Sequence, residues 1–134
     1  MSRNLFTEKK NKSSQLDQQK LNKWFETNNF YPVEFENGKF RIAVNSMGSY
    51  IYHSLLENPG YTTYIKEGFG GSLLVFEIEL SESELNCQCY CPMMIFGFKR
   101  VELAFKEKTM WITKYRKEGY NYLEKFKEFI SKTV

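Results

Sequence analysis

The sequence lacks any long apolar run. No stretch of the 134 residues approaches the roughly 18–20 apolar residues that a membrane-spanning helix needs. Residues 1–15 contain lysines without an apolar stretch behind them, so a secretory signal is not indicated. Apolar residues still make up 42% of the chain, which is enough for one packed core. We therefore expect a cytoplasmic protein with a single globular domain.

Cysteine and histidine are scarce, which disfavours most metal sites. The chain has three cysteines and one histidine, His53. Cys87, Cys89 and Cys91 alternate with polar residues and with Tyr90, so an extended strand would place all three thiols on one face. The outer two would lie about 13 Å apart, whereas a zinc ion needs each thiolate at about 2.3 Å. We interpret them as buried strand residues; a metal site and a redox site are the alternatives.

Recognisable catalytic and phosphate-binding motifs are also lacking. The glycine-rich segment at 68–71 has neither the GxGxxG spacing nor a GK[ST] sequence behind it. No nucleophile motif accompanies His53. Glu77 and Glu79 share one face of a predicted strand, where carboxylates are usually solvated or paired with a cross-strand lysine or arginine. We therefore expect no catalytic residue, no cofactor and no metal, and the protein is predicted not to be an enzyme.

The chain begins with a basic segment and a helix. Residues 1–12 predict a flexible basic tail, followed by one globular domain over 13–134. Ser14 and Asp17 have the spacing of a capping box. Apolar residues then recur at helical spacing, which predicts a helix at about 14–28.

A hairpin is predicted next. Residues 30–36 and 39–44 flank Asn37 and Gly38, and Asn-Gly is the strongest short hairpin signal because both residues tolerate a positive φ. Pro32 cannot donate to a ladder, so the first of these strands should lie at a sheet edge.

The middle of the chain alternates mostly between apolar and polar residues, which predicts strands. We expect strands at 61–66, 74–80, 86–91, 101–105 and 110–115, with an interruption at Pro92 and an ambiguous segment at 49–57. The turn signal Asn58-Pro59-Gly60 separates two of these segments.

An amphipathic helix is predicted at about 121–132, beginning near Asn121. The whole pattern predicts an α+β fold. Its mainly antiparallel curved sheet or partial barrel would have about six or seven strands, covered by the terminal helices. The order strand, turn, strand and helix at its end resembles the layout that closes pleckstrin-homology-like barrels.

Charge is distributed unevenly along the chain. The net charge is +3, but residues 31–90 carry eight acidic and three basic groups, whereas residues 91–134 carry ten basic and five acidic groups. Tyrosines lie among the basic residues, as in surfaces that bind single-stranded nucleic acid. The candidate interaction patch comprises Lys99, Arg100, Lys106, Lys108, Lys114, Tyr115, Arg116, Lys117 and Lys125.

These features favour binding over catalysis. The function we expect is that of a non-catalytic intracellular binding protein, such as a small inhibitor that blocks a macromolecular protein partner. Frequent Lys, Asn, Phe, Tyr and Ile suggest an AT-rich bacterial or phage genome, where immunity and anti-defence inhibitors of this size occur. The alternatives are a domain that binds RNA or single-stranded nucleic acid through the basic patch, and a pleckstrin-homology-like module that binds lipid or phosphate. The sequence leaves homo-oligomerisation open.

Overall fold

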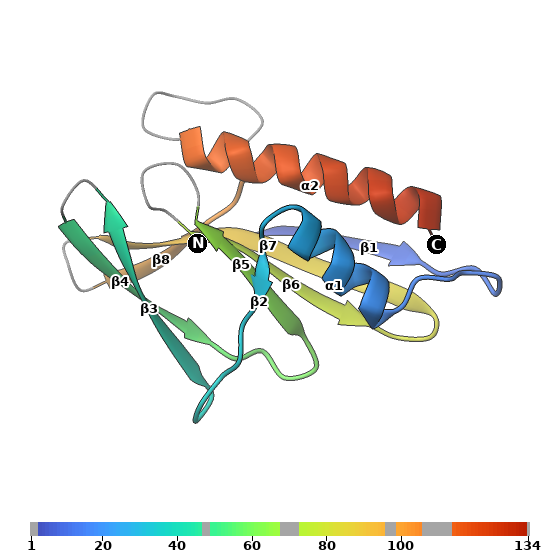
Figure 1. The fold of residues 1–134 in the computed structure, drawn as a ribbon, viewed down its shortest axis with the longest axis horizontal. Helices are drawn as coiled ribbons and strands as arrows, with labels where there is room; N and C mark the ends of the chain where they lie inside the picture. The colour runs from blue at the N-terminus through green and yellow to red at the C-terminus, as the bar shows by residue number, and fades with distance from the viewer. Residues whose placement is uncertain (1–2, 47–48, 68–72, 96–98, 106–113, 134) are drawn as a thin grey trace.

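The computed structural model places a helix towards each end of the chain on one face of a mainly antiparallel sheet (Figure 1). It describes residues 3–46, 49–67, 73–95, 99–105 and 114–133; within these ranges the side chains of 42–46, 49–54, 93–95, 99–101 and 114–115 are not described. The α+β class predicted from the sequence is confirmed. Neither described helix combines the length and the apolar composition that crossing a bilayer requires.

The described strands form one large sheet and one hairpin. In chain order the elements are β1 (Asn4–Lys9), α1 (Gln18–Thr27), β2 (Tyr31–Pro32), β3 (Lys39–Ser46), β4 (Ser49–Leu56), β5 (Thr62–Glu67), β6 (Leu73–Leu80), β7 (Glu84–Ile95), β8 (Lys99–Leu103) and α2 (Lys114–Thr133). The large sheet has the order β1-β7-β6-β5-β2, with β8 also paired to β7, while β3 pairs with β4. Within the described ranges β1 and β2 do not pair, so the sheet is open and is not a closed barrel.

The central strand β7 directs its backbone hydrogen bonds to its two sides in alternation. On the β6 side, Ser81 N–H donates to the Glu84 carbonyl at 2.9 Å; on the β1 side, Lys10 N–H donates to the Ser83 carbonyl at 2.8 Å. Both pairs continue the registers of the neighbouring strands. Because hydrogen-bonded pairs alternate along an antiparallel ladder, even-numbered residues of β7 bond to β6. Odd-numbered residues of β7 bond to even-numbered residues of β1.

Pro92 lies inside β7, so the prediction that it interrupts the strand is wrong. Its position in the ladder explains why it is tolerated. As an even-numbered residue it turns its backbone nitrogen towards β6, and the described pairing with β6 ends at Tyr90. On the other side it lies opposite Glu102 of β8, at a position where the ladder needs no N–H. The strand therefore continues past the proline with β8 as its partner.

Residues 4–9 form β1, so the prediction of a flexible tail is wrong for this segment. Asn4 lies opposite Cys89 and Lys9 opposite Glu84. Phe6 turns towards the helices, where its ring meets that of Phe126 at 6.0 Å. Phe6 is the one apolar residue of β1 that faces inward, and the adjacent Leu5 faces outward, so the segment lacks the apolar–polar alternation that identifies a strand from sequence.

The first helix begins later than predicted. Asp17 is its N-cap, and its carboxylate accepts a hydrogen bond from the backbone N–H of Lys20 at 2.9 Å. The Ser14 hydroxyl, expected to cap the helix, accepts instead from Leu16 N–H at 3.2 Å. The helix therefore spans Gln18–Thr27 and lacks the first four residues of the predicted range.

The turn at Asn37 and Gly38 is confirmed, but the strands around it pair differently from the prediction. Both residues have positive φ, 55° and 74°, and Glu36 and Lys39 form an isolated bridge across the turn. Residues 30–36 contribute only β2, which lies at the sheet edge beside β5, as Pro32 predicted. β3 pairs instead with β4, which resolves the ambiguous segment at 49–57 as a strand.

The second helix begins at Lys114, well before the predicted start near Asn121. Residues 114 and 115, predicted as the end of a strand, are helical, and residues 110–113 lie outside the described residues. Glycine has a low helix propensity, so propensity does not explain Gly119 within α2. Packing requires a glycine at this position. A Cβ there would lie 2.5 Å from Cδ1 of Phe105, so the helix crosses this ring at the closest distance a glycine permits.

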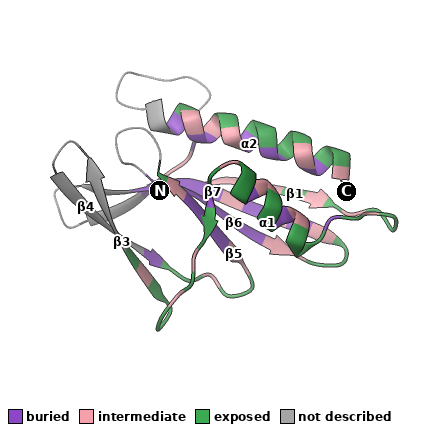
Figure 2. Cartoon of the chain, in the orientation of Figure 1, coloured by how far each residue is buried: buried purple, intermediate pink, exposed green. Residues whose placement is uncertain are grey.

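The sheet carries an apolar cluster on each face. Figure 2 shows the buried positions along the strands β5, β6 and β7 and on the helices. The larger cluster lies under the helices and is rich in aromatic rings; Phe25 stacks on Tyr64 with centroids 4.0 Å apart. The smaller cluster, on the opposite face, contains Leu55, Ile65, Leu73, Val75 and Tyr90. Residues 73–78 of β6 are consequently buried on both faces, and the polar face predicted for this strand is not solvated.

Candidate functional site

The face of the sheet opposite the helices is only partly covered by the smaller apolar cluster. Beyond that cluster lies a groove of about 290 Å³ whose lining includes Leu5, Thr7, Tyr61, Asn86 and Gln88. We call this region the open face. Leu5 is 68% exposed although it is a large apolar residue. The open face therefore combines an exposed apolar side chain with hydroxyl and amide groups.

One end of the open face is fixed by the guanidinium of Arg3. Its Nη1 donates to Glu77 Oε1 at 2.9 Å and to Gln88 Oε1 at 2.7 Å. Its Nε and Nη2 donate to the two carboxylate oxygens of Glu102, each at 2.8 Å. Hydrogen bonding to Glu102 raises the pKa of Arg3 above its ordinary value, so the residue stays charged.

Tyr90 completes this group, which we call the Arg3 cluster: Arg3, Glu77, Gln88, Tyr90 and Glu102. The Tyr90 hydroxyl donates to Glu77 Oε2 at 2.9 Å, and the Arg3 guanidinium lies over the Tyr90 ring at 4.1 Å. The sequence predicts that Glu77 is solvated or paired with a cation. It is paired with Arg3, and it is also only 1% exposed. Both carboxylates are bound to the same cation, so the cluster is suited to holding the start of β1 in place.

Next to the Arg3 cluster, β1 presents a free strand edge. Even-numbered residues of β1 bond to β7, so the N–H and C=O groups of Leu5, Thr7 and Lys9 point away from the sheet. In the described part of the chain β7 is the one sheet neighbour of β1. We call these outward backbone groups the β1 edge. An uncovered edge of this kind can pair with a further strand.

The predicted basic patch is only partly described. Lys99 and Arg100 lie in β8, and Lys114 and Tyr115 lie at the start of α2, but the side chains of these four are not described. Lys106 and Lys108 lie outside the described residues.

The three remaining members of the patch lie on α2. Arg116 is only 9% exposed, and its Nε donates to the Ala104 carbonyl at 2.8 Å. Lys117 and Lys125 are exposed, and the Lys125 ammonium lies 5.4 Å from the Tyr122 ring. Arg116 therefore joins α2 to the end of β8 and is turned away from solvent.

The cysteines lie where the alternation predicted them. Cys87, Cys89 and Cys91 are buried on the helical face of β7 and are free thiols. Among the described residues no group of three histidine, cysteine, aspartate or glutamate side chains could hold a metal ion. Burial raises the pKa of Cys87 and of Cys91, so both are held as unreactive thiols.

We therefore expect the folded protein to resist thiol reagents at pH 8. Dithionitrobenzoate should label none of the three cysteines within minutes in buffer and all three in guanidinium chloride. Absorbance at 412 nm measures the released thiolate. Rapid labelling of any thiol in the folded protein would contradict the packing of β7.

Alkaline pH should destabilise the fold. Burial raises the pKa of Tyr64 from 10.0 to about 12. The folded protein holds the Tyr64 proton more tightly than the unfolded chain does, and this difference adds to the free energy of unfolding. The contribution is complete below the pKa of Tyr64 in the unfolded chain and is lost as pH rises from about 10 to about 12. Cys87 and Cys91 shift in the same direction, so the loss should begin nearer pH 9. Urea denaturation between pH 7 and 11 measures the trend; constant stability would contradict it.

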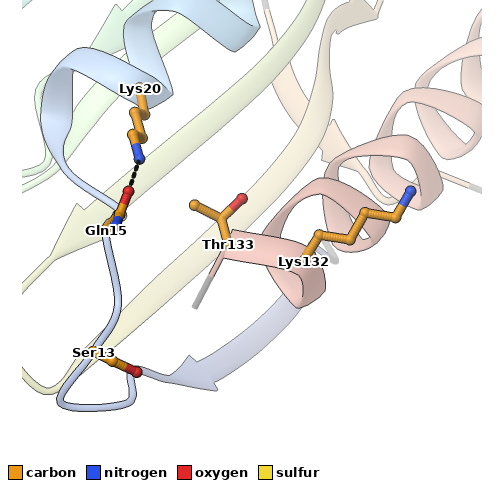
Figure 3. A pocket seen from close by; sticks show the side chains of 5 residues that line it. All are labelled: Ser13, Gln15, Lys20, Lys132 and Thr133. Carbon is orange, nitrogen blue, oxygen red and sulfur yellow. Dashed lines mark hydrogen bonds between the residues drawn. The ribbon is translucent and has the colours of Figure 1, made fainter.

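A polar hollow between the 10–17 segment and the end of α2 is not an anion site. It is lined by Ser13, Gln15, Lys20, Lys132 and Thr133. Lys20 Nζ donates to Gln15 at 3.3 Å, whereas Lys132 Nζ pairs with Glu128 at 3.0 Å and points away from Lys20 (Figure 3). The two ammonium groups therefore do not converge on one ligand.

Comparisons with models of protein families, with curated proteins and with solved structures found no match to this chain. The site is accordingly defined by its own geometry. The β1 edge and the roles of Arg3 and Glu102 are not visible in the sequence, because their partners lie far away along the chain. The two adjacent apolar residues Leu5 and Phe6, within an otherwise polar segment, are the one local signal for β1.

Proposed function

We propose that this protein is a non-catalytic protein-binding module that docks through the β1 edge and the adjoining open face. The observation that carries this proposal is the set of outward backbone groups of Leu5, Thr7 and Lys9, beside an exposed leucine. An extended segment of a partner can add to such an edge as a further strand, with main-chain hydrogen bonds supplying affinity. Side chains of the added strand would reach the groove lined by Tyr61 and Gln88, which supplies specificity.

Rigid support favours this use of the edge. The Arg3 cluster fixes the start of β1, and the Thr7 hydroxyl bonds to Asn86 of β7 at 2.6 Å. A strand that is already ordered loses little conformational entropy when a partner pairs with it. A small domain with such an edge could act as an inhibitor by covering a functional surface of its partner, and the immunity or anti-defence class fits the composition of the chain.

Proline at position 7 tests the proposal. The N–H of Thr7 points away from β7, so Thr7→Pro removes one donor of the β1 edge without removing a backbone hydrogen bond of the sheet, although it does remove the side-chain bond to Asn86, which Thr7→Val removes alone. We expect this variant to keep its fold and to lose partner binding by about tenfold or more, since a strand pair is broken at its centre. Capture from extract of the native host, with and without nuclease, identifies the partner, and titration of the purified partner measures the affinity.

Leu5→Asp and Leu56→Asp form the matched pair of variants. Both residues are exposed apolar side chains, 68% and 54% exposed, but Leu56 lies on β4, which among the described strands pairs with β3 in a separate sheet and not with β1. A partner of the β1 edge should be lost with Leu5→Asp and Thr7→Pro and retained with Leu56→Asp. Equal capture by all variants would exclude the β1 edge. Capture that disappears after nuclease treatment would favour the nucleic-acid alternative.

A further inference from the structure

A second surface lies on the opposite side of the molecule, between the two helices. A shallow groove of about 250 Å³ is lined by Lys20, Lys23, Trp24, Thr27 and Phe129, and we call it the helix groove. Its floor is formed by the rings of Trp24 and Phe129, which stack with centroids 5.8 Å apart. Both rings are half-buried. The volume lies below the roughly 300–1,000 Å³ of typical small-molecule sites and is suited to one large side chain.

The floor of the helix groove is held rigidly from below. The Trp24 ring meets Phe25 at 5.0 Å and Phe126 at 5.1 Å, both of which are fully buried. The indole is thus fixed on three sides by aromatic rings. The indole N–H forms no hydrogen bond with another described residue. It is also not one of the described polar atoms that are buried without a partner. The indole N–H is therefore not fully buried and keeps its donor capacity for a ligand.

The rim of the helix groove is positively charged. Lys20 bonds to the neutral amide of Gln15, and neither Lys20 nor Lys23 forms an ion pair with another described residue. Lys127 and Lys132 of α2, in contrast to Lys20 and Lys23, pair with glutamates on their own helix. Unpaired ammonium groups beside an apolar floor are complementary to carboxylates that flank an apolar side chain.

We propose that the helix groove binds an acidic segment of a partner protein. One large apolar side chain of that segment lies against Trp24 and Phe129, and neighbouring carboxylates meet Lys20 and Lys23. Tryptophan is enriched among residues that dominate binding energy at protein interfaces. The two rings already stack on each other, which suits an inserted side chain better than a nucleic-acid base. This proposal is independent of strand addition, because the open face lies on the other side of the sheet.

Selection from a random peptide library displayed on phage tests this inference. The library is selected on the wild-type protein and counter-selected on the Lys20→Glu/Lys23→Glu variant. We expect the enriched peptides to carry a large apolar residue flanked by aspartate or glutamate. Fluorescence anisotropy then measures their affinity, which should fall by about tenfold or more in the double variant, as expected when rim charges reverse.

Three further variants make the result specific to the helix groove. Lys117→Glu/Lys125→Glu reverses the same number of exposed charges outside the groove and should change the affinity less than about twofold. Thr27→Glu places a negative charge on the exposed side of the groove without altering the core and should weaken binding. Thr7→Pro should leave peptide affinity unchanged, which separates this site from the β1 edge.

Several outcomes would overturn the proposal. They are a failure to enrich any peptide, enrichment of peptides without net negative charge, or equal losses in the Lys20/Lys23 and Lys117/Lys125 variants. Displacement of an enriched peptide by oligothymidylate, with the same dependence on Lys20 and Lys23, would assign the helix groove to nucleic acid instead.

Discussion

An Arg3→Ala variant is expected to lose about 3 kcal/mol of the free energy of unfolding. Arg3 is the cation bound to Glu77 and Glu102, and the side chain of Glu77 is 1% exposed. Without the guanidinium, Glu77 keeps its hydrogen bonds from Tyr90 and Asn58 but remains a buried charge without a cation. The Arg3 side chain is 27% exposed, so water entering there holds the loss at the lower end of the range for broken buried pairs. Urea denaturation followed by circular dichroism measures it.

Two further variants separate the buried charge from the loss of side-chain contacts. Glu77→Gln in the Arg3→Ala background removes the unpaired charge, so the double variant should be more stable than Arg3→Ala alone. Lys12→Ala removes a cation from an exposed position near the same terminus and should change stability by less than about 0.5 kcal/mol. A loss for Arg3→Ala as small as that for Lys12→Ala would show that the cluster does not hold β1.

Gly119→Ala is expected to destabilise the protein by about 2 kcal/mol, although alanine is the better helix former. The propensity difference alone would stabilise α2 by about 1 kcal/mol. The added Cβ, however, would lie 2.5, 2.6 and 2.8 Å from three atoms of the Phe105 ring. Phe105 is 3% exposed and packs on Phe76, so moving its ring would disturb the core. Overpacking of this kind costs about 3 kcal/mol, which exceeds the gain in propensity. Thermal and urea denaturation measure the difference.

The control for helix propensity lies two residues further along α2. Asn121 is exposed, so Asn121→Ala should stabilise the protein by about 0.5 kcal/mol. Phe105→Leu in the Gly119→Ala background shortens the ring side chain and should recover part of the loss. If Gly119→Ala were as stabilising as Asn121→Ala, the close approach of α2 to Phe105 would be disproved.

Local patterns identified most of the strands and the Asn37-Gly38 turn. The alternation over 74–80 and through the three cysteines corresponds to β6 and β7, and Asn37-Gly38 forms the expected turn. These features depend on residues that are adjacent in the chain, so their physical cause is visible in the sequence.

Strand partners and the Arg3 cluster depend on contacts between distant residues. Nothing near the Asn37-Gly38 turn indicates that β2 pairs with β5 while β3 pairs with β4. Glu77 lies on the alternate face of β6, which local alternation predicts to be solvated. That face is buried because Arg3 and the smaller apolar cluster cover it. Gly119 shows the same limit, since only its contact with Phe105 explains a glycine within a helix.

The place of β1 in the sheet has a consequence for biosynthesis. Asn4 lies opposite Cys89, which is made 85 residues later along the chain. Domains emerge from the N-terminus at about 5–20 residues per second, so β1 must wait several seconds for its partner strand. During that interval both edges of this segment are unpaired in the nascent chain and open to chaperones that bind extended segments.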